Sequence, residues 1–353
     1  MNLVTGATGL LGSHIVEQLC KSGRAVRALV RRTSDTSWLE GQSVEIVYGD
    51  VTDEASIDRA MAGVSTVYHS AARVGDWGPW REFQQITIDG TENMVHAAER
   101  AEVKRFIHVS SISVYGYVDG EGLSFDESAP LGYGLYRWAY YSRAKVQAEE
   151  LIWSAQKRGR VAFSVIRPSW LYGERDRTTI GRLIANVRSG KVKLIGDGLN
   201  RLNVVHAANV AEACILAADS DAAIGEAYNC SNDGVLTQKQ YFNRVAAASG
   251  AKPVSRTVPY KVVYNLAFLL ECLYRLVGSK KPPLITRYTV WLIGRRCFFE
   301  THKAREQLGW RSTISYEDGI PEAVAHYLCR NGEGSDGSSK ERSDSGVAVA
   351  GGA

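Results

Sequence analysis

The sequence contains little that would place the chain in a membrane, in a metalloprotein or on a nucleic acid. No uninterrupted apolar run in its 353 residues reaches the ~18 residues that a membrane-spanning helix requires. Its six cysteines form no C-x-x-C pair and no spacing typical of metal ligands. The net charge is only +4, and no basic segment is interleaved with aromatic residues. We therefore expect no metal and no nucleic-acid partner, and reduced cysteines in a cytoplasmic protein.

The composition is that of an ordinary globular protein. Hydrophobic residues make up 45% of the chain and charged residues 23%, enough for one large or two modest domains. From residue 331 onward the sequence is rich in Gly, Ser and charged residues and cannot build a core. We expect 331–353 to be a disordered tail.

The first chemical signal is the glycine-rich segment 3–14, LVTGATGLLGSH, which joins a short apolar run to an amphipathic one. Gly6 allows a sharp turn, Gly9 lets the backbone approach a ligand, and Gly12 lets a helix pack closely on a strand. Free N–H groups at the start of such a helix favour a pyrophosphate. Taken alone, the G-x-x-G-x-x-G spacing also fits a plain glycine-rich turn. The predicted cofactor contacts in this loop are Gly6, Thr8, Gly9, Leu10, Leu11 and Gly12.

The second predicted strand, residues 26–30, ends in Arg31 and Arg32 rather than in an acidic residue. An Asp or Glu there binds the ribose 2′-hydroxyl of NAD, whereas an arginine suits the 2′-phosphate of NADP. We therefore favour NADP(H) over NAD and assign Arg31 to the 2′-phosphate; the alternative is two solvated arginines. After the next predicted strand, Asp50 would either accept from the adenine amino group or cap the following helix.

Strands and helices alternate through the first half of the chain, which predicts an α/β fold with a doubly wound parallel sheet, the Rossmann fold. We assign 1–173 to this NAD(P)-binding domain, with 201–235 returning to it through a strand at 203–206. Residues 174–200 and 236–330 would form a smaller, mostly helical substrate-binding region.

Two further features of the first half allow several interpretations. His69 lies inside an apolar run, so we expect a packed core histidine rather than a catalytic one. The loop 75–80 carries Trp77 and Trp80. Exposed indoles are unfavourable, so these two are expected to cover substrate, nicotinamide or a neighbouring helix.

Tyr141 and Lys145 are four residues apart and would share one face of a helix. A tyrosine titrates near pH ~10 and is a poor acid–base catalyst at neutral pH unless its pKa is lowered. The Lys145 ammonium one turn away, with a positive nicotinamide nearby, would lower it. Ser111, just past the predicted strand 105–109, would hold the substrate oxygen with the phenol. Y-x-x-x-K alone is a weak signal, and a surface pair is the alternative.

In combination these motifs resemble those of the extended short-chain dehydrogenase/reductases, the NAD-dependent epimerase/dehydratase superfamily. The matching segments are TGATGLLG at 5–12, GDV at 49–51, HSAA at 69–72, GT at 90–91, VSSISVYG at 109–116, YSRAK at 141–145 and RPSWLYG at 167–173. The resemblance implies a catalytic triad of Ser111, Tyr141 and Lys145, with Tyr141 as general acid–base and Lys145 also on the nicotinamide ribose. One departure is Thr87, which stands where the family commonly has Asn; Asn93 is nearby. Further cofactor contacts implied by the resemblance are Asp50, Val51, Ala71, Ala72 and Pro168.

Within this superfamily the sequence looks most similar to the 3β-hydroxysteroid/sterol dehydrogenase and dihydroflavonol-reductase-like branch. Residues 202–210 lack the Arg and two Asp that sugar epimerases often show, and Asn209 looks like the steroid branch. The resemblance implies an oxidoreductase that interconverts a secondary alcohol and a ketone on an apolar, sterol-, steroid- or lipid-like substrate. The alternative is a nucleotide-sugar epimerase or dehydratase, with Asp126 or Glu127 as the acid of a dehydratase. Its diphosphate would be bound by Arg175, Arg177, Arg182 and Arg188.

The segment 259–277 is apolar except for four polar residues that fall on one arc of ~120° of a helix. These are Lys261, Asn265, Glu271 and Arg275. With the basic flanks of 282–294, the segment suits a membrane surface or a lipid-like substrate, and core or a dimer interface is an equal alternative. Residues 259–299 are therefore a candidate peripheral membrane contact, and we also expect a homodimer.

Overall fold

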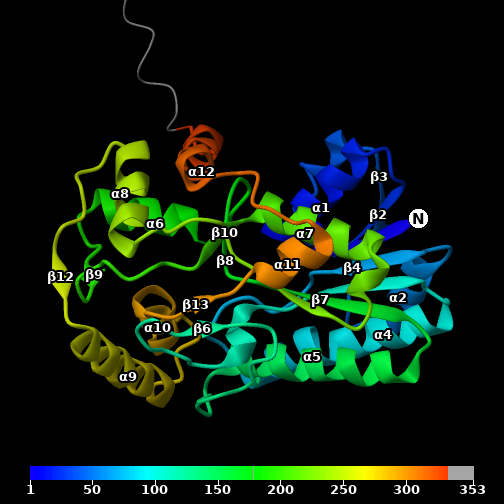
Figure 1. Ribbon diagram of the computed structural model, residues 1–353, viewed down its shortest axis with the longest axis horizontal. Helices are drawn as coiled ribbons and strands as arrows, with labels where there is room; N and C mark the ends of the chain where they lie inside the picture. The colour runs from blue at the N-terminus through cyan, green and yellow to red at the C-terminus, as the bar shows by residue number, and fades with distance from the viewer. Residues whose placement is uncertain (178, 333–353) are drawn as a thin grey trace, which may run out of the picture.

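The computed structural model describes residues 1–177 and 179–332, so the predicted disordered tail lies outside it except for Asn331 and Gly332. A large parallel sheet with helices on both faces occupies one side of the molecule (Figure 1). Small sheets and helices, most of them from the second half of the chain, occupy the other side.

The sheet has seven strands, all paired in parallel, in the order β11-β7-β5-β4-β1-β2-β3. The order reverses between β1 and β4, which creates a crevice at the carboxyl ends of these strands. β5 is buried at every position, as expected for a strand covered on both faces. This architecture confirms the predicted doubly wound sheet. The strands are β1 (Asn2–Thr5), β2 (Val26–Val30), β3 (Val44–Tyr48), β4 (Thr66–His69), β5 (Arg105–Val109), β7 (Ala162–Pro168) and β11 (Ala227–Cys230).

Helices cover both faces of the sheet and enclose one hydrophobic core on each side. On one face lie α1 (Leu10–Lys21), α7 (Ala207–Asp219) and α11 (His302–Leu308) (Figure 1). On the other lie α2 (Glu54–Met61), α4 (Gly90–Arg100) and α5 (Tyr140–Arg158). Between β4 and α4 the chain forms α3 (Trp80–Phe83) and a π-helical segment, Gln84–Asp89. Short 3₁₀ segments are Leu39–Gly41, Ile112–Tyr115 and Asp221–Ala223.

The remaining described residues form three two-stranded parallel sheets and five more helices. The sheets pair β8 (Trp170–Tyr172) with β10 (Val204–His206), β9 (Leu194–Ile195) with β12 (Thr257–Val258), and β6 (Ser124–Phe125) with β13 (Phe298–Phe299). The helices are α6 (Ile180–Arg188), α8 (Gln238–Ala248), α9 (Tyr260–Leu276), α10 (Arg287–Gly294) and α12 (Tyr316–Arg330). No helix in the described part of the chain is both long and apolar enough to cross a bilayer.

One predicted connection is wrong. The strand at 203–206 exists as β10, but it does not return to the large sheet. β11 occupies the edge beside β7, where Ala227 is the partner of Val165. β10 is therefore left to pair with β8, which continues the chain just beyond β7.

Two side-chain predictions are answered by the packing. The His69 ring is fully buried and lies between the hydroxyls of Thr5, 2.8 Å away, and Thr91, 3.1 Å away, so it is the core histidine that was predicted. Trp77 is buried against the end of α9, where its Nε1 donates to the Ser279 carbonyl at 3.1 Å. Of the three roles considered for this loop, covering a neighbouring helix is the one observed for Trp77.

Candidate active site

The predicted catalytic residues meet beside the carboxyl end of β5. Ser111 lies two residues beyond β5, and its Oγ accepts from the Ser113 backbone N–H at 3.2 Å, which fixes the side chain at the start of a 3₁₀ turn. Tyr141 is in the first turn of α5, and its phenol interacts with the Ser111 side chain. Lys145, one turn further along α5, donates from Nζ to the Val109 carbonyl at 2.7 Å. These contacts bring the three residues together at the carboxyl end of β5, the edge of the sheet at which the crevice opens.

The pKa of Tyr141 differs from the prediction. Burial raises the pKa of Tyr141 above its ordinary value, and its contact with Ser111 offsets only part of that rise. The expected lowering of the Tyr141 pKa by Lys145 is not found, and the Lys145 ammonium donates to the Val109 carbonyl. Burial lowers the pKa of Lys145 itself to about 8, against an opposing effect of Glu149. The phenol is therefore the protonated, proton-donating form at neutral pH.

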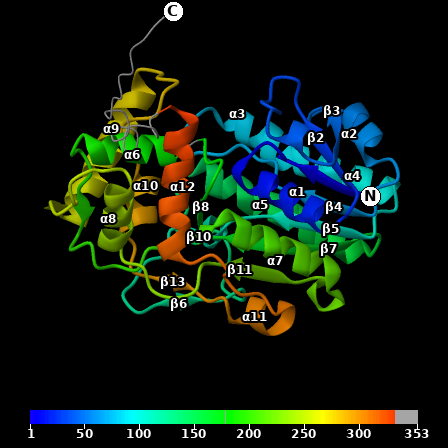
Figure 2. The same ribbon diagram turned by 90° about the horizontal axis from the view of Figure 1, so that it is seen from above.

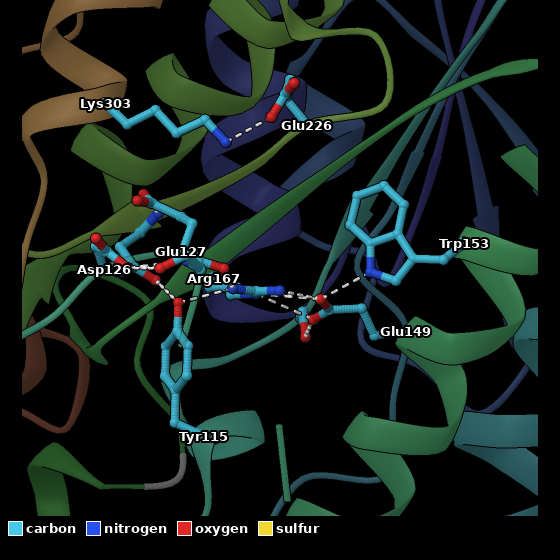
Figure 3. A network of polar contacts seen from close by, with 11 residues as sticks. Tyr115, Asp126, Glu127, Glu149, Trp153, Arg167, Glu226 and Lys303 are labelled. Carbon is cyan, nitrogen blue, oxygen red and sulfur yellow. Dashed lines mark hydrogen bonds and ion pairs between the residues drawn. The ribbon is translucent and has the colours of Figure 1, made fainter. Parts of the chain in front are cut away.

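A buried ion pair that the sequence did not predict holds the base of this site together (Figure 3). Glu149, one turn after Lys145, pairs with Arg167 of β7 at 2.5 Å, and both side chains are almost completely buried. Its Oε2 also accepts from the Ser110 hydroxyl at 2.6 Å, next to Ser111. Arg167 donates in turn to the Tyr115 hydroxyl at 2.7 Å. The network connects α5, β7 and the residues after β5. Its only signal in the sequence is Glu149, which follows Lys145 at the same four-residue spacing that separates Tyr141 from Lys145.

The glycine loop has the close packing that a dinucleotide cradle needs. Gly6 has φ +67°, and a Cβ there would lie 2.8 Å from Ser70 Oγ and 2.9 Å from the Ala71 nitrogen. A Cβ on Gly12 would lie 2.2 Å from the Gly6 carbonyl oxygen, so only glycine lets α1 begin directly against the turn. Gly9 is exposed at the start of α1, where free N–H groups favour a pyrophosphate. Thr8 belongs to the same loop, Leu10 and the buried Leu11 begin α1, Ala72 follows β4, and the buried Pro168 ends β7.

Arg31 lies where the prediction placed it, at the rim of an open hollow of about 390 Å³. The hollow is formed by the ends of β2 and β3 and the start of α2, and Arg32 and Arg59 also line it. The Arg32 guanidinium carbon lies 5.2 Å from the centroid of the Tyr48 ring. Arg31 is exposed and makes no such cation–π contact within the described residues. The lining residues are Arg31, Arg32, Thr33, Tyr48, Gly49, Asp50, Asp53, Ser56 and Arg59.

The two readings of Asp50 are resolved in part. Its Oδ1 accepts from both the backbone and the hydroxyl of Thr52 at 2.9 Å, so the carboxylate shapes the turn, while the N-cap of α2 is Asp53. Asn93 donates to the carbonyl of the neighbouring Val51 at 3.1 Å and so braces this loop from α4. The residues present therefore fit a dinucleotide along the crevice, from the hollow to Lys145.

An aromatic wall covers the side of Tyr141 that faces the second half of the chain. Tyr288 of α10 has its ring centroid 6.0 Å from that of Tyr141, and Trp291 follows at 5.8 Å from Tyr288. Tyr117 lies 5.1 Å from Trp291 and stacks on Tyr136 at 4.9 Å. Aromatic ring surface thus covers the phenol on this side, and Arg287 lies over the Tyr136 ring at 3.8 Å.

A buried cation stands at the far end of this wall. Arg295, just after α10, is completely buried, and its guanidinium carbon is 4.2 Å from the Trp291 ring and 5.0 Å from the Phe299 ring. None of its three guanidinium nitrogens has a hydrogen-bond partner within the described residues. Burial lowers the pKa of Arg295. Nothing local in the sequence distinguishes this arginine from its exposed neighbour Arg296.

Of the residues proposed for the alternative function, all but Arg182 have other contacts in the described part of the chain. Arg175 binds Glu17 and Ser13 of α1, Arg177 pairs with Asp35 at 3.1 Å, and Arg188 donates to the Ser249 carbonyl at 3.0 Å. Asp126 is exposed and accepts from Ser128, and Glu127 accepts from the Asn229 backbone N–H at 2.7 Å. The structure therefore does not bring these side chains to Tyr141.

Comparison with known proteins agrees with this geometry. The profile of the NAD dependent epimerase/dehydratase family matches residues 2–231, from β1 through β11. The chain belongs to this family. Its glycine loop, Ser111, Tyr141 and Lys145 all fall within the matched part of the chain.

Several members of the family resemble the chain over nearly its whole length. A 2-alkyl-3-oxoalkanoate reductase from Stenotrophomonas maltophilia (strain K279a) is 30% identical, covering 90% of this chain and 96% of that protein. A 3-beta-hydroxysteroid dehydrogenase from Mycolicibacterium neoaurum is 28% identical, over 92% and 90%. The crystal structure of gox2253 has a TM-score of 0.78 at 29% identity, covering 94% of this chain and 99% of that one. The structure of MoeE5 with UDP-glucose and NAD has a TM-score of 0.72 at 24% identity, over 94% and 99%, and supports the fold.

Proposed function

We propose that the chain is an NAD(P)-dependent oxidoreductase that interconverts a secondary alcohol and a ketone on an apolar substrate. The observation that carries the proposal is the contact between Ser111 and Tyr141, with Lys145 one turn away, at the carboxyl edge of the sheet and behind an aromatic wall. The relatives named as reductases and as 3β-hydroxysteroid dehydrogenases support it.

The residues account for the movement of the proton. A bound nicotinamide gives up a hydride in reduction and accepts one in oxidation. The hydroxyls of Ser111 and Tyr141 hold the carbonyl oxygen between them, and in reduction the protonated phenol donates its proton to that oxygen. In the reverse direction the phenol oxygen takes the proton back. Lys145, one turn further along α5, contacts the nicotinamide ribose.

The nucleotide-sugar alternative has less support. A nucleotide-sugar enzyme needs cationic side chains that can bind the diphosphate of its substrate. Two of the arginines considered for this role already form ion pairs, Arg175 with Glu17 and Arg177 with Asp35. To decide between the two, the purified protein is offered NADPH with apolar ketones and, separately, UDP- and dTDP-sugars. We expect net NADPH oxidation with the ketones. Conversion of a sugar nucleotide with no net change in cofactor would replace this proposal with an epimerase.

We further propose that the substrate carries a carboxylate, which binds Arg295. A fully buried guanidinium without partners is costly, and a planar carboxylate satisfies its fork of donors. Relatives are named for an alkanoate and for a sterol-4-alpha-carboxylate, which supports the same chemistry.

This proposal is tested with a 3-oxo acid and its methyl ester, which differ only in charge. We expect kcat/KM to favour the acid by about tenfold or more, as a charge-assisted hydrogen bond to a buried group would give. Arg295→Met should lose that preference, keep turnover of the ester and raise the Tm, because an unpaired buried charge is removed. Arg296→Met, at the exposed neighbour, is the control. A preference that survives Arg295→Met would reject the role of Arg295, while ester turnover would still support the oxidoreductase.

A further inference from the structure

Helix α9 buries its acidic residue and exposes a row of apolar residues, the reverse of what an ordinary surface helix does. Its single acid, Glu271, faces inward and is almost fully buried, accepting from the backbone N–H of Arg287 at 2.7 Å and from its guanidinium at 2.9 and 2.7 Å. A buried ion pair of this kind fixes the rotation of the helix about its axis, because turning it outward would leave Arg287 without its partner.

The opposite side of α9 presents an apolar stripe to solvent. Its five residues recur at intervals of four and three, so they form one continuous row along the helix. α9 lies at the rim of the molecule, away from the seven-stranded sheet, in both Figure 1 and Figure 2. A contiguous exposed apolar row on this scale marks an interaction surface. The α9 stripe consists of Val262 (58% exposed), Leu266 (50%), Leu269 (62%), Leu273 (52%) and Leu276 (86%).

The charges around the α9 stripe are of one sign. Within residues 259–284 the exposed charged side chains at the two ends are Lys261, Lys280 and Lys281, and the one acid is the buried Glu271. If two copies paired through this row, in either direction, lysines would face lysines with no acid between them. An anionic lipid surface instead offers opposite charge to these lysines and an apolar boundary to the leucines.

We propose that the α9 stripe docks on an anionic lipid bilayer, with its leucines in the interface and the flanking lysines on lipid phosphates. The inner side of the same helix leads toward the catalytic site. Arg275 of α9 lies over the rings of Trp77 at 4.5 Å and Tyr140 at 5.2 Å, and Tyr140 precedes the catalytic tyrosine. Docking here would therefore bring the lipid surface close to the site that takes an apolar substrate, although the docking itself does not depend on the reaction.

The test is co-sedimentation of the full-length protein with vesicles of phosphatidylcholine alone or mixed with phosphatidylserine. We expect binding to the anionic vesicles that weakens with salt, and little binding to the neutral ones. The double variant Leu269→Asp with Leu273→Asp should lose binding by about tenfold or more, because two buried leucine contacts are removed. Lys280→Glu with Lys281→Glu should weaken binding and reduce its salt dependence.

Val235→Asp is the matched control, since Val235 is 68% exposed but lies outside α9. Unchanged Tm and NADPH affinity show that each variant is folded. The proposal is overturned if the wild type ignores both kinds of vesicle, or if the leucine variant binds as well as the control. A dimer in lipid-free solution that the leucine variant dissociates would show that a second copy covers the stripe instead.

Discussion

Lys145 is the residue at which burial and catalysis are most directly linked. Its pKa is lowered to about 8 by burial, so its ammonium loses its proton at a lower pH than an ordinary lysine. In the proposed reaction, the charge that holds the nicotinamide ribose is then lost. We expect kcat/KM for ketone reduction to fall as the pH rises through about 8, because this profile reports groups of the free enzyme. A profile still flat at pH ~10, in the ordinary lysine range, would show that Lys145 does not control the rate.

Arg31 governs the choice of cofactor in this account. It is exposed at the rim of a hollow that also holds Arg32 and Arg59, which suits a 2′-phosphate. Arg31→Ala should raise the Kd for NADPH by about tenfold or more, the value of one hydrogen bond to a charged group, and leave the Kd for NADH unchanged. Arg160→Ala, at an exposed arginine beyond the end of α5, is the control. Equal losses for both cofactors would place Arg31 outside the phosphate contact, and tight NADH binding by the wild type would identify NAD as the cofactor.

The sequence revealed those site residues whose chemistry depends on local spacing. Tyr141 and Lys145 share a helical face, and Ser111 follows a strand, so their meeting at one edge of the sheet could be predicted. Arg295 could not, because its significance lies in what surrounds it: two rings and no polar partner, all set by packing. The rise in the Tyr141 pKa could not be predicted either, because it comes from burial of the phenol by the surrounding fold.

At the scale of elements, the Glu149–Arg167 pair fixes α5 on β7 and thereby positions Tyr141 and Lys145. Glu149→Gln should lower the free energy of unfolding by about 3–5 kcal/mol, because it leaves the buried Arg167 charge unpaired. Asp58→Asn breaks the exposed pair with Arg100 and should cost less than about 1 kcal/mol. Urea unfolding of both variants gives the comparison. Equal small losses would mean that the buried pair is not a structural requirement of the site.

The elements that were predicted correctly are those with strong local patterns. The buried strands of the large sheet and the helix after the glycine loop follow from apolar runs and from glycines that only a tight turn accommodates. The partner of β10 could not be found in this way, because β10 and β11 are both short and buried and only their competition for the edge of β7 decides which one joins the sheet. Likewise, the helix over 259–277 was predicted but its rotation was not: Glu271 is buried on Arg287, whereas Lys261 and Asn265 are exposed.

At the scale of the whole molecule, the two halves meet around one phenol. The large sheet supplies the cofactor edge with Ser111, Tyr141 and Lys145, and the second half supplies the aromatic wall with Tyr288 and, beyond it, the buried cation. Neither half contains a complete site. The central claim is therefore that Tyr141 transfers a proton to a ketone held between the halves.

The most direct test is the steady-state rate of NADPH oxidation with an apolar ketone for the wild type and for Tyr141→Phe. Removal of a general acid should lower kcat by about 10²–10⁴-fold. The Kd for NADPH should stay close to that of the wild type, because the glycine loop and Arg31 are untouched. Tyr133→Phe, at a tyrosine that is 67% exposed, is the matched control and should retain full activity. A Tyr141→Phe enzyme that turns over at the wild-type rate would contradict the account.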